Sequence, residues 1–312
     1  MSDRRHRRWA FLAVLLGVSL CAWGQWPYPT PEGQLRLMSW NIEFLNVRTP
    51  PRTPEQLNLL GQRIAGFDTA ILALQEITQI TVLQDIASAL GPNWRVLSTP
   101  GQENALLYDE QKVALVSGGT LTTLTGAPFT TYPGASHRRP ISGIFEPVGG
   151  GEAFRVVGVH CHWSSEPAKV AEGQWLRDQT VQYLSTPGQP EDIFVLGDYN
   201  GEPGWPPHPT LLQGGQLTLL PKGNPPPWTG VLWDGEIDHC AATQGALSRL
   251  PVQSALVVKS SDYGETPEQF EAGYSDHYPI VVDLLVPEPM TTSLLVAGLL
   301  ALCVRRRRRN AR

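Results

Sequence analysis

Between residues 35 and 286 the chain alternates short apolar runs with polar, helix-like stretches. Residues 35–41 alternate with the period of two that a strand requires, and 69–74 form a continuous apolar run typical of a buried strand. Residues 54–65 have a helical pattern that opens on Pro54, because Pro is favoured in the first helical turn. The remaining runs predict strands at 105–108, 113–116, 154–160, 192–197 and 280–282, and helices at 79–90 and 168–184.

Gly and Pro separate these elements, most densely at 203–209 and 221–227. Many strands and few helices in a chain of 312 residues indicate a sandwich-type α/β domain covered by helices, and not a doubly wound sheet. The sequence contains no Gly-rich motif of the kind that binds nucleotide phosphates.

The N-terminal segment differs from this pattern. Residues 4–8 carry four Arg, 9–20 form an apolar run, and Ala22 and Gly24 supply the small residues that signal peptidase recognises. We therefore interpret 1–24 as a secretory signal peptide. A short membrane anchor is the alternative, although the apolar run is short for a spanning helix.

The C-terminal segment combines a Pro-containing motif, an apolar segment and an Arg cluster, in that order. Residues 286–289 read Val-Pro-Glu-Pro, an apolar segment follows at 293–304, and five Arg stand at 305–309. Such an apolar segment is marginal for crossing a bilayer, and the Arg cluster is expected on the cytoplasmic side. The arrangement resembles the PEP-CTERM sorting signal of Gram-negative bacteria, which implies that an exosortase removes 286–312. An uncleaved tail anchor is the alternative.

Taken together, the two ends predict an exported protein with a catalytic domain at 25–286. It would be processed by signal peptidase and exosortase and transiently anchored in the membrane through its C-terminal segment. Its expected location is the periplasm, the cell surface or the outside of a Gram-negative bacterium.

The net charge of the chain without its N- and C-terminal segments limits the functions that are expected. Residues 25–287 hold 14 Lys and Arg against 27 Asp and Glu, so this core has a formal charge near −13, compared with −5 for the whole chain. That balance argues against a broad basic surface for nucleic acid and suits a site that gathers divalent cations. Only Cys161 and Cys240 lie in the core, so no disulfide framework is predicted, and whether these two pair is left open.

Polar side chains recur where the predicted strands end. Strand ends that emerge at one edge of a sheet would bring such groups together, and several coincidences of this kind are improbable by chance. The series comprises Asn41, Glu43, Glu76, His160, His162, Asp198, Asn200, Asp238, His239, Asp276 and His277.

The last two members, Asp276 and His277, stand immediately before a buried strand. Imidazole is the side chain that titrates nearest neutrality, and an adjacent carboxylate can bind a metal or orient the ring. Alone, this pair is equally typical of a surface turn. As the last of a series of strand-end groups, it indicates an active site.

The oxygen-rich part of the series favours a hard cation. Carboxylate and amide oxygens suit Mg²⁺, with Mn²⁺ as a possible substitute, and no His and Cys spacing matches a closed zinc site. The six oxygen donors are Asn41, Glu43, Glu76, Asp198, Asn200 and Asp276.

Five motifs in order resemble the endonuclease/exonuclease/phosphatase superfamily, which has the deoxyribonuclease I-like fold. They are Ser-Trp-Asn-Ile-Glu at 39–43, Leu-Gln-Glu at 74–76, Gly-Asp-Tyr-Asn at 197–200, Ile-Asp-His at 237–239 and Ser-Asp-His-Tyr-Pro-Ile at 275–280. The resemblance spans about 35–286. It implies a four-layered α/β sandwich, with two packed mixed β-sheets flanked by helices, and Mg²⁺-dependent hydrolysis of phosphoesters.

Carried over motif by motif, the resemblance assigns the metal ligands and the water. Glu76 would be the main metal ligand, helped by Asn41 and Glu43, with Asp276 near the metal. Asp198 and Asn200 would position the nucleophilic water and the phosphate, or hold a second ion.

The same resemblance assigns the remaining catalytic groups. His277 would act as general base or stabilise the phosphorane, and Asp238 would fix its tautomer. His160 matches the second catalytic histidine, and Arg138 matches a phosphate-binding arginine whose fork suits phosphate oxygens.

Several placements leave alternatives open. Glu103 is the candidate acidic partner of the second histidine, His162 is the alternative to His160, and Arg139 is the alternative to Arg138. His239 is expected to support the site by packing and not to act in catalysis. Tryptophans in the Pro-rich loops either anchor those loops or stack on a base or sugar; they are Trp205, Trp228 and Trp233.

The sequence therefore predicts a secreted, divalent-metal-dependent phosphodiesterase, with DNA or RNA as the first choice of substrate. A phospholipase C-like or phosphomonoester hydrolase is the second choice, although no long apolar hairpin for bilayer insertion is visible. An inactive, surface-retained binding module is the rival from another class. The oligomeric state is not predicted.

Overall fold

The computed structural model describes residues 29–45, 53–77, 79–120 and 132–286. The predicted signal peptide and the segment of the predicted sorting signal from 287 onward lie outside the described residues. Among the residues that are described, no helix combines the length and apolar character needed to span a membrane.

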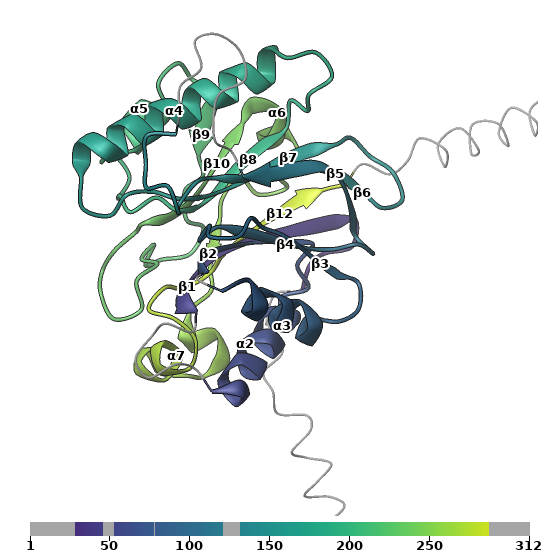
Figure 1. Cartoon of the computed structure of the whole chain (residues 1–312), viewed down its shortest axis with the longest axis vertical. Coiled ribbons are helices and arrows are strands. Elements are labelled where there is room, and N and C mark those ends of the chain that lie inside the picture. The colour runs from purple at the N-terminus through teal and green to yellow at the C-terminus, as the bar shows by residue number, and fades with distance from the viewer. Residues whose placement is uncertain (1–28, 46–52, 78, 121–131, 287–312) are drawn as a thin grey trace, which may run out of the picture.

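Two six-stranded sheets form the centre of the molecule (Figure 1). The first has the order β11-β12-β1-β2-β4-β3 and the second the order β5-β6-β7-β8-β10-β9. The first sheet contains β1 (Gln34–Leu45), β2 (Ile71–Ile77), β3 (Trp94–Leu97), β4 (Ala105–Asp109), β11 (Leu256–Val257) and β12 (Ile280–Leu285). The second contains β5 (Val113–Thr120), β6 (Ile141–Pro147), β7 (Phe154–His160), β8 (Ile193–Asp198), β9 (Leu217–Leu219) and β10 (Asp238–Thr243).

Both sheets are mixed, because one parallel pair lies at the centre of each. β1 runs parallel to β2, and β7 runs parallel to β8, while the other named pairs are antiparallel. Each parallel pair is joined through a helix, as parallel strands require.

Helices cover the two outer faces, which gives four layers (Figure 1). α2 (Pro54–Gly66), α3 (Ile80–Leu90) and α7 (Pro267–Gly273) lie on the side of the first sheet, and α4 (Glu166–Ser185) covers the second. The short helices are α5 (His208–Leu211), α6 (Gln244–Ser248) and the 3₁₀ helix η1 (Ser260–Tyr263). The predicted four-layered α/β sandwich is confirmed.

Side chains that alternate along β7 and β8 contribute to two separate hydrophobic clusters, one on each face of the second sheet. Phe154 and Phe194 belong to the core between the sheets, while Val157 and Val195 pack in a second cluster under α4 with Trp175. Successive side chains of a strand point to opposite faces, so both faces of β7 and β8 carry apolar residues.

Gly158 of β7 faces the first sheet. A Cβ atom at this position would lie 3.2 Å from Ile141, 3.4 Å from Leu106 and 3.6 Å from Ala73. Ala73 and Leu106 belong to the other sheet, so a Cβ atom here would be in contact with both sheets, and its tightest contact would be to Ile141 of its own sheet.

The prediction missed the elements that have weak local patterns. β3, β6, β9, β10 and β11 and the helices α5, α6 and α7 were not predicted, and β1 and β5 extend further than expected. β6 contains Gly143 and β9 has three residues, so both depend on pairing with neighbours and not on their own propensity.

A buried ion pair fastens β12 to β1 near the middle of the first sheet. Arg36 is 1% exposed and lies opposite Asp283 in the strand register. Its Nε and Nη2 atoms each donate to Asp283 at 2.7 Å, and Nη1 donates to the Phe67 carbonyl at 3.0 Å. β12 begins just after His277, so this pair also holds the strand that delivers that histidine.

We expect Asp283→Asn to lower the free energy of unfolding by about 3 kcal/mol, because it leaves a buried guanidinium without its countercharge. Urea unfolding followed by circular dichroism measures the change. Glu110→Gln is the matched control, since the Arg95–Glu110 pair is 46% and 45% exposed and should contribute about 0–1 kcal/mol. An equal effect of the two substitutions would contradict this account.

Candidate active site

One edge of the sandwich collects the strand-end side chains. β1, β2, β7 and β8 end there, and β10 and β12 begin there because they run antiparallel to β8 and β1. The strand register sets His160 opposite Asp198, and Asp198 opposite Asp238. The expected gathering of polar groups at one edge is therefore present, although β10 and β12 supply theirs from N-terminal ends.

The Asn41 amide is the centre of this cluster. Its Nδ2 atom donates to Glu76 Oε1 at 3.2 Å and to Asp198 Oδ2 at 3.0 Å. Its Oδ1 atom accepts the Glu43 backbone N–H at 3.0 Å. Asn41 is fully buried, so a single amide connects a carboxylate of the first sheet with a carboxylate of the second.

Three site residues have left-handed backbone conformations that non-glycine residues rarely adopt. Glu43, Glu76 and Asn200 have φ values of 46°, 60° and 50°. Gln75 bonds to Ser39 at 3.3 Å, so regular alternation would send Glu76 to the opposite face of the sheet. The left-handed turn instead brings Glu76 to Asn41. Strain of this kind costs about 1–3 kcal/mol per residue and concentrates at functional sites.

His277 and Asp238 form a buried pair on the other side of Asp198. The two residues meet at 2.8 Å between His277 Nδ1 and Asp238 Oδ2. The backbone around the histidine is fixed as well, since its N–H donates to Ser275 Oγ at 3.1 Å and its carbonyl accepts from Trp40 Nε1 at 2.8 Å. The predicted partnership of Asp238 with His277 is thus present in the geometry.

The second ring nitrogen of His277 points toward carboxylates. Nε2 lies 4.0 Å from Asp198 Oδ2 and 3.8 Å from Asp276 Oδ1. Burial disfavours the charged ring, but the charge and hydrogen bond of Asp238, with Asp198 and Asp276, raise the pKa of His277 to about 10. His277 is therefore an imidazolium at neutral pH.

For Asp198, the surroundings disfavour the charged form, whereas those of His277 favour it. Burial, with the charge of Asp238, raises the pKa of Asp198 to about 7, against the opposing effects of His277 and of hydrogen bonds from Asn200 and Asn41. A carboxylate with a pKa close to neutrality can accept a proton under working conditions. Asp198 is the member of the cluster best suited to act as a base.

His160 stands between acidic groups of the two sheets. Its Nε2 atom lies 3.7 Å from Glu76 Oε1 and 3.6 Å from Asp198 Oδ2, and its Nδ1 atom lies 3.9 Å from Glu103 Oε2. Burial and the charge of Arg138 hold the pKa of His160 well below its usual value, so the ring is neutral. Distances beyond 3.5 Å leave room for a water, an ion or a substrate oxygen between these groups.

Arg138 is held in the same corner by Glu103. Arg138 Nε donates to Glu103 Oε2 at 3.1 Å. Asn104 donates through Nδ2 to the carbonyls of Arg138 and Arg139 at 3.0 and 2.9 Å, and Gln102 bonds to the same loop. Three consecutive residues therefore fix the arginine loop, and Glu103 connects it to His160.

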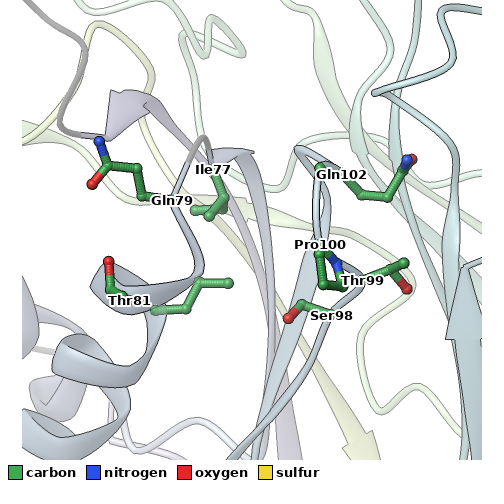
Figure 2. Close-up of a pocket in the computed structure, with 9 residues that line it drawn as sticks. Ile77, Gln79, Thr81, Ser98, Thr99, Pro100 and Gln102 are labelled. Atoms are coloured by element: carbon green, nitrogen blue, oxygen red, sulfur yellow. The ribbon is translucent and has the colours of Figure 1, made fainter.

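A cavity of about 300 Å³ lies behind this corner. Figure 2 shows Ile77, Gln79 and Thr81 on one wall and Ser98, Pro100 and Gln102 on the other, with the Gln102 side chain directed away from the gap. The walls are joined by the Ile77 N–H, which donates to the Glu103 carbonyl at 3.0 Å. The cavity thus adjoins the end of β2, which carries Glu76, and the loop that carries Glu103.

The donor set fits a divalent cation. Asp198, Asp238 and His277 offer ligand atoms within 4.8 Å of one another, but Asp238 is engaged by His277. We therefore favour the side of Asp198 that faces Glu76, where the carboxylates are loosely spaced and Asn41 supplies an oxygen with a second lone pair. Buried carboxylates need countercharge, and Mg²⁺ or Mn²⁺ prefers these oxygen ligands.

The structure separates His162 and His239 from the reacting groups. β7 ends at His160, and the His162 ring instead accepts the backbone N–H groups of Ser164 and Ser165 at 3.2 and 3.1 Å. His162 therefore does not replace His160 at the edge. His239 follows Asp238 in β10 and points to the opposite face, where it contacts Lys222 at 3.1 Å.

The structure also decides whether Cys161 pairs with Cys240 and which of two neighbouring arginines bonds to Glu103. Cys161 and Cys240 are both free and buried, so they do not pair. Arg138, and not Arg139, bonds to Glu103.

Some supporting residues were not identified from the sequence. Ser275, whose Oγ donates to the Asn41 carbonyl at 2.7 Å, stands inside a motif that drew attention only to its Asp and His. Asn104 directly follows Glu103, but its role depends on a loop 34 residues away. Thr229 accepts the N–H of Asp238 at 3.1 Å from a Pro-rich loop with no recognisable pattern.

Several solved structures of other proteins have a fold similar to that of this chain. Structures of similar fold include an endonuclease/exonuclease/phosphatase family protein from Bacteroides thetaiotaomicron, with 17% identity, a TM-score of 0.63 and coverage of 83% of this chain and 99% of that one. A mannosyl-6-phosphatase from the same organism has 18% identity, a TM-score of 0.63 and coverage of 80% and 99%. D. rerio TDP2, complexed with a single-strand DNA product, has 14% identity, a TM-score of 0.56 and coverage of 81% and 99%.

No curated protein sequence matches the chain. Residues 38–277 match the Endonuclease/Exonuclease/phosphatase family, and this range includes every site residue described above. With its four-layered sandwich and its cluster of acids, amides and imidazoles at one edge, the chain belongs to that family.

Proposed function

We propose that the protein is a divalent-metal-dependent hydrolase of phosphodiester bonds. One observation carries the proposal: the Asp198 carboxylate lies 3.6 Å from His160 Nε2 and 4.0 Å from His277 Nε2, and the Asn41 amide links it to Glu76. This set can accept one proton, hold one positive charge and bind one cation within a single corner of the site.

Each side chain then has one task in the reaction. Asp198 takes a proton from a water molecule that attacks phosphorus as the P–O bond to the leaving group breaks, and the leaving alkoxide takes up a proton from solvent. The Asn200 backbone N–H holds the Asp198 carboxylate in place, because it donates to Oδ1 at 2.7 Å. The imidazolium of His277 and the guanidinium of Arg138 stabilise the negative charge that develops on the phosphoryl oxygens. His160 remains neutral and can donate a hydrogen bond to one of these oxygens.

Glu76, with Asn41 and Glu43, would hold the cation beside Asp198. When bound, such an ion neutralises developing charge and lowers the pKa of water. The high pKa of His277 supports a charge-stabilising role over that of a general base. Asp238 supports this role, because it holds the ring through Nδ1 and leaves Nε2 directed into the site.

For the substrate, nucleic acid is our first choice and a phosphomonoester of a sugar the second. Structures of similar fold include proteins of both kinds, a mannosyl-6-phosphatase and a protein complexed with a single-strand DNA product, and this likeness supports both choices. We also propose that the protein acts outside the cytoplasm, which the order of parts in 1–24 and 286–312 supports.

A substrate panel tests the reaction class. Plasmid DNA, RNA, a sugar phosphate, sphingomyelin and a chromogenic phosphodiester are each incubated with Mg²⁺ and with EDTA. We expect EDTA-sensitive hydrolysis of at least one of them. Absence of such hydrolysis from the whole panel would favour a binding module.

We expect His277→Ala to lower kcat by roughly 10²–10⁴-fold, because it removes the charged group beside Asp198. Hydrolysis of the active panel substrate and the circular dichroism spectrum are measured on the same preparation. His162→Asn is the matched control, since an amide oxygen can accept the same backbone N–H groups. Turnover like that of the wild type in folded His277→Ala would rule out the proposed role.

We expect Asp238→Asn to move the alkaline limb of the kcat/KM profile to lower pH. The active form is charged His277, so activity is lost as pH rises through its pKa of about 10. Without the Asp238 charge, burial dominates and lowers that pKa. A pH–rate profile measures the shift, and an alkaline limb that does not move would show that Asp238 is not the charge partner.

A further inference from the structure

A second cavity opens beside Asn200, and none of its lining residues is shared with the cavity of Figure 2. Its volume is about 340 Å³, and its lining includes Asn200, Lys169, Trp205 and Ile237. Ile237 directly precedes Asp238, and Asn200 bonds to Asp198. The cavity therefore begins where the catalytic corner ends.

Trp205 forms an exposed wall of this cavity and is held on a fixed loop. Its side chain is 62% exposed. Its N–H donates to the Glu202 carbonyl at 2.9 Å, and its own carbonyl accepts the His208 N–H at 3.0 Å. A Cβ atom at Gly201 would lie 2.1 Å from the Pro206 carbonyl oxygen, so the loop is closely packed.

A buried histidine connects that loop to the catalytic strand. His208 is 1% exposed, and its Nδ1 atom lies 3.0 Å from the Glu202 carbonyl and 3.2 Å from that of Trp205. Its ring stacks on Tyr199 with centroids 5.1 Å apart and planes at 21°. Since Tyr199 stands between Asp198 and Asn200, the backbone of the loop that carries Trp205 is held at a fixed place relative to the reacting groups.

The charges around the cavity select against a second phosphate. Glu166 and Glu202 both line it, while its single lysine, Lys169, already donates to the Asn200 carbonyl. Two carboxylates repel a polyanionic strand but accept hydrogen bonds from hydroxyl or amino groups. An aromatic face with such acceptors suits an uncharged ring.

On the basis of the function proposed above, we propose that this cavity binds the uncharged ring, a sugar or a nucleobase, of the group esterified to the scissile phosphate. Trp205 stacks on the ring, and Glu166 and Glu202 accept hydrogen bonds from its polar edge. The substrate is then a phosphoester whose ring-bearing group in this cavity carries no further phosphate, which fits the end of a nucleic-acid strand or a single sugar and not the interior of a strand.

The test compares three p-nitrophenyl phosphodiesters that differ only in the second group, which is thymidine, mannose or methyl. We expect the thymidine or the mannose ester to exceed the methyl ester in kcat/KM. Trp205→Ala should reduce that ratio by about tenfold through KM, and Trp205→Phe should restore most of it. The preferred ester identifies the ring.

Trp163→Ala is the matched control, since Trp163 is 69% exposed and does not line the cavity. We expect it to leave the ratio as in the wild type. A fall shared equally by all three esters in Trp205→Ala, or no fall in any of them, would overturn the proposal.

A binding measurement separates this proposal from the proposed function. Calorimetric titration with thymidine and with methyl mannoside, neither of which carries a phosphate, requires no turnover. We expect one of them to bind the wild type and to bind Trp205→Ala about tenfold more weakly. If neither binds the wild type, or if both proteins bind equally, the subsite is refuted, even where hydrolysis itself is observed.

Discussion

The amide of Asn41 is the interaction on which the rest of the site depends. It comes from β1 of the first sheet and donates both to Glu76 of the same sheet and to Asp198 of the second. Two buried carboxylates would otherwise repel each other across the gap between the sheets. The amide therefore holds the two acids within hydrogen-bonding distance of one group, at 3.2 and 3.0 Å.

Around Asn41, the fold gives two histidines opposite protonation states. His160 is buried beside Arg138 and is neutral, while His277 bonds to Asp238 and is charged. Asp198 has a raised pKa because burial and Asp238 both oppose its ionisation. Environment, and not residue type, divides the roles of base, neutral donor and fixed positive charge among the members of the cluster.

Much of the site could be predicted from the sequence, because strand ends in a sandwich share an edge. Asn41, Asp198 and His277 were found in this way without knowledge of which strands pair. The resemblance to a known family then placed Arg138 and Asp238, which lie far from one another in the chain.

The directions of some side chains and the positions of several loops could not be predicted from the sequence. His239 adjoins Asp238, yet the alternation of β10 sends it to the opposite face, and only the start of the strand decides which of the two reaches the site. The left-handed φ of 60° at Glu76 interrupts the alternation of β2, so Glu76 reaches Asn41 on the face from which regular pleating would direct it away. Asn104 and Trp205 acquire their positions from loops whose partners are distant in the sequence or have no regular period.

The central claim is that one amide joins acids of two sheets into a cation-dependent phosphoesterase site. Calorimetric titration of Mg²⁺ into the wild type and into Asn41→Leu, with hydrolysis of a chromogenic phosphodiester measured alongside, tests it most directly. The account predicts Mg²⁺ binding at least tenfold weaker and turnover roughly 10²–10³-fold lower in a folded Asn41→Leu variant, since two preorganised donations are lost. Unchanged Mg²⁺ binding and turnover in that variant would contradict it.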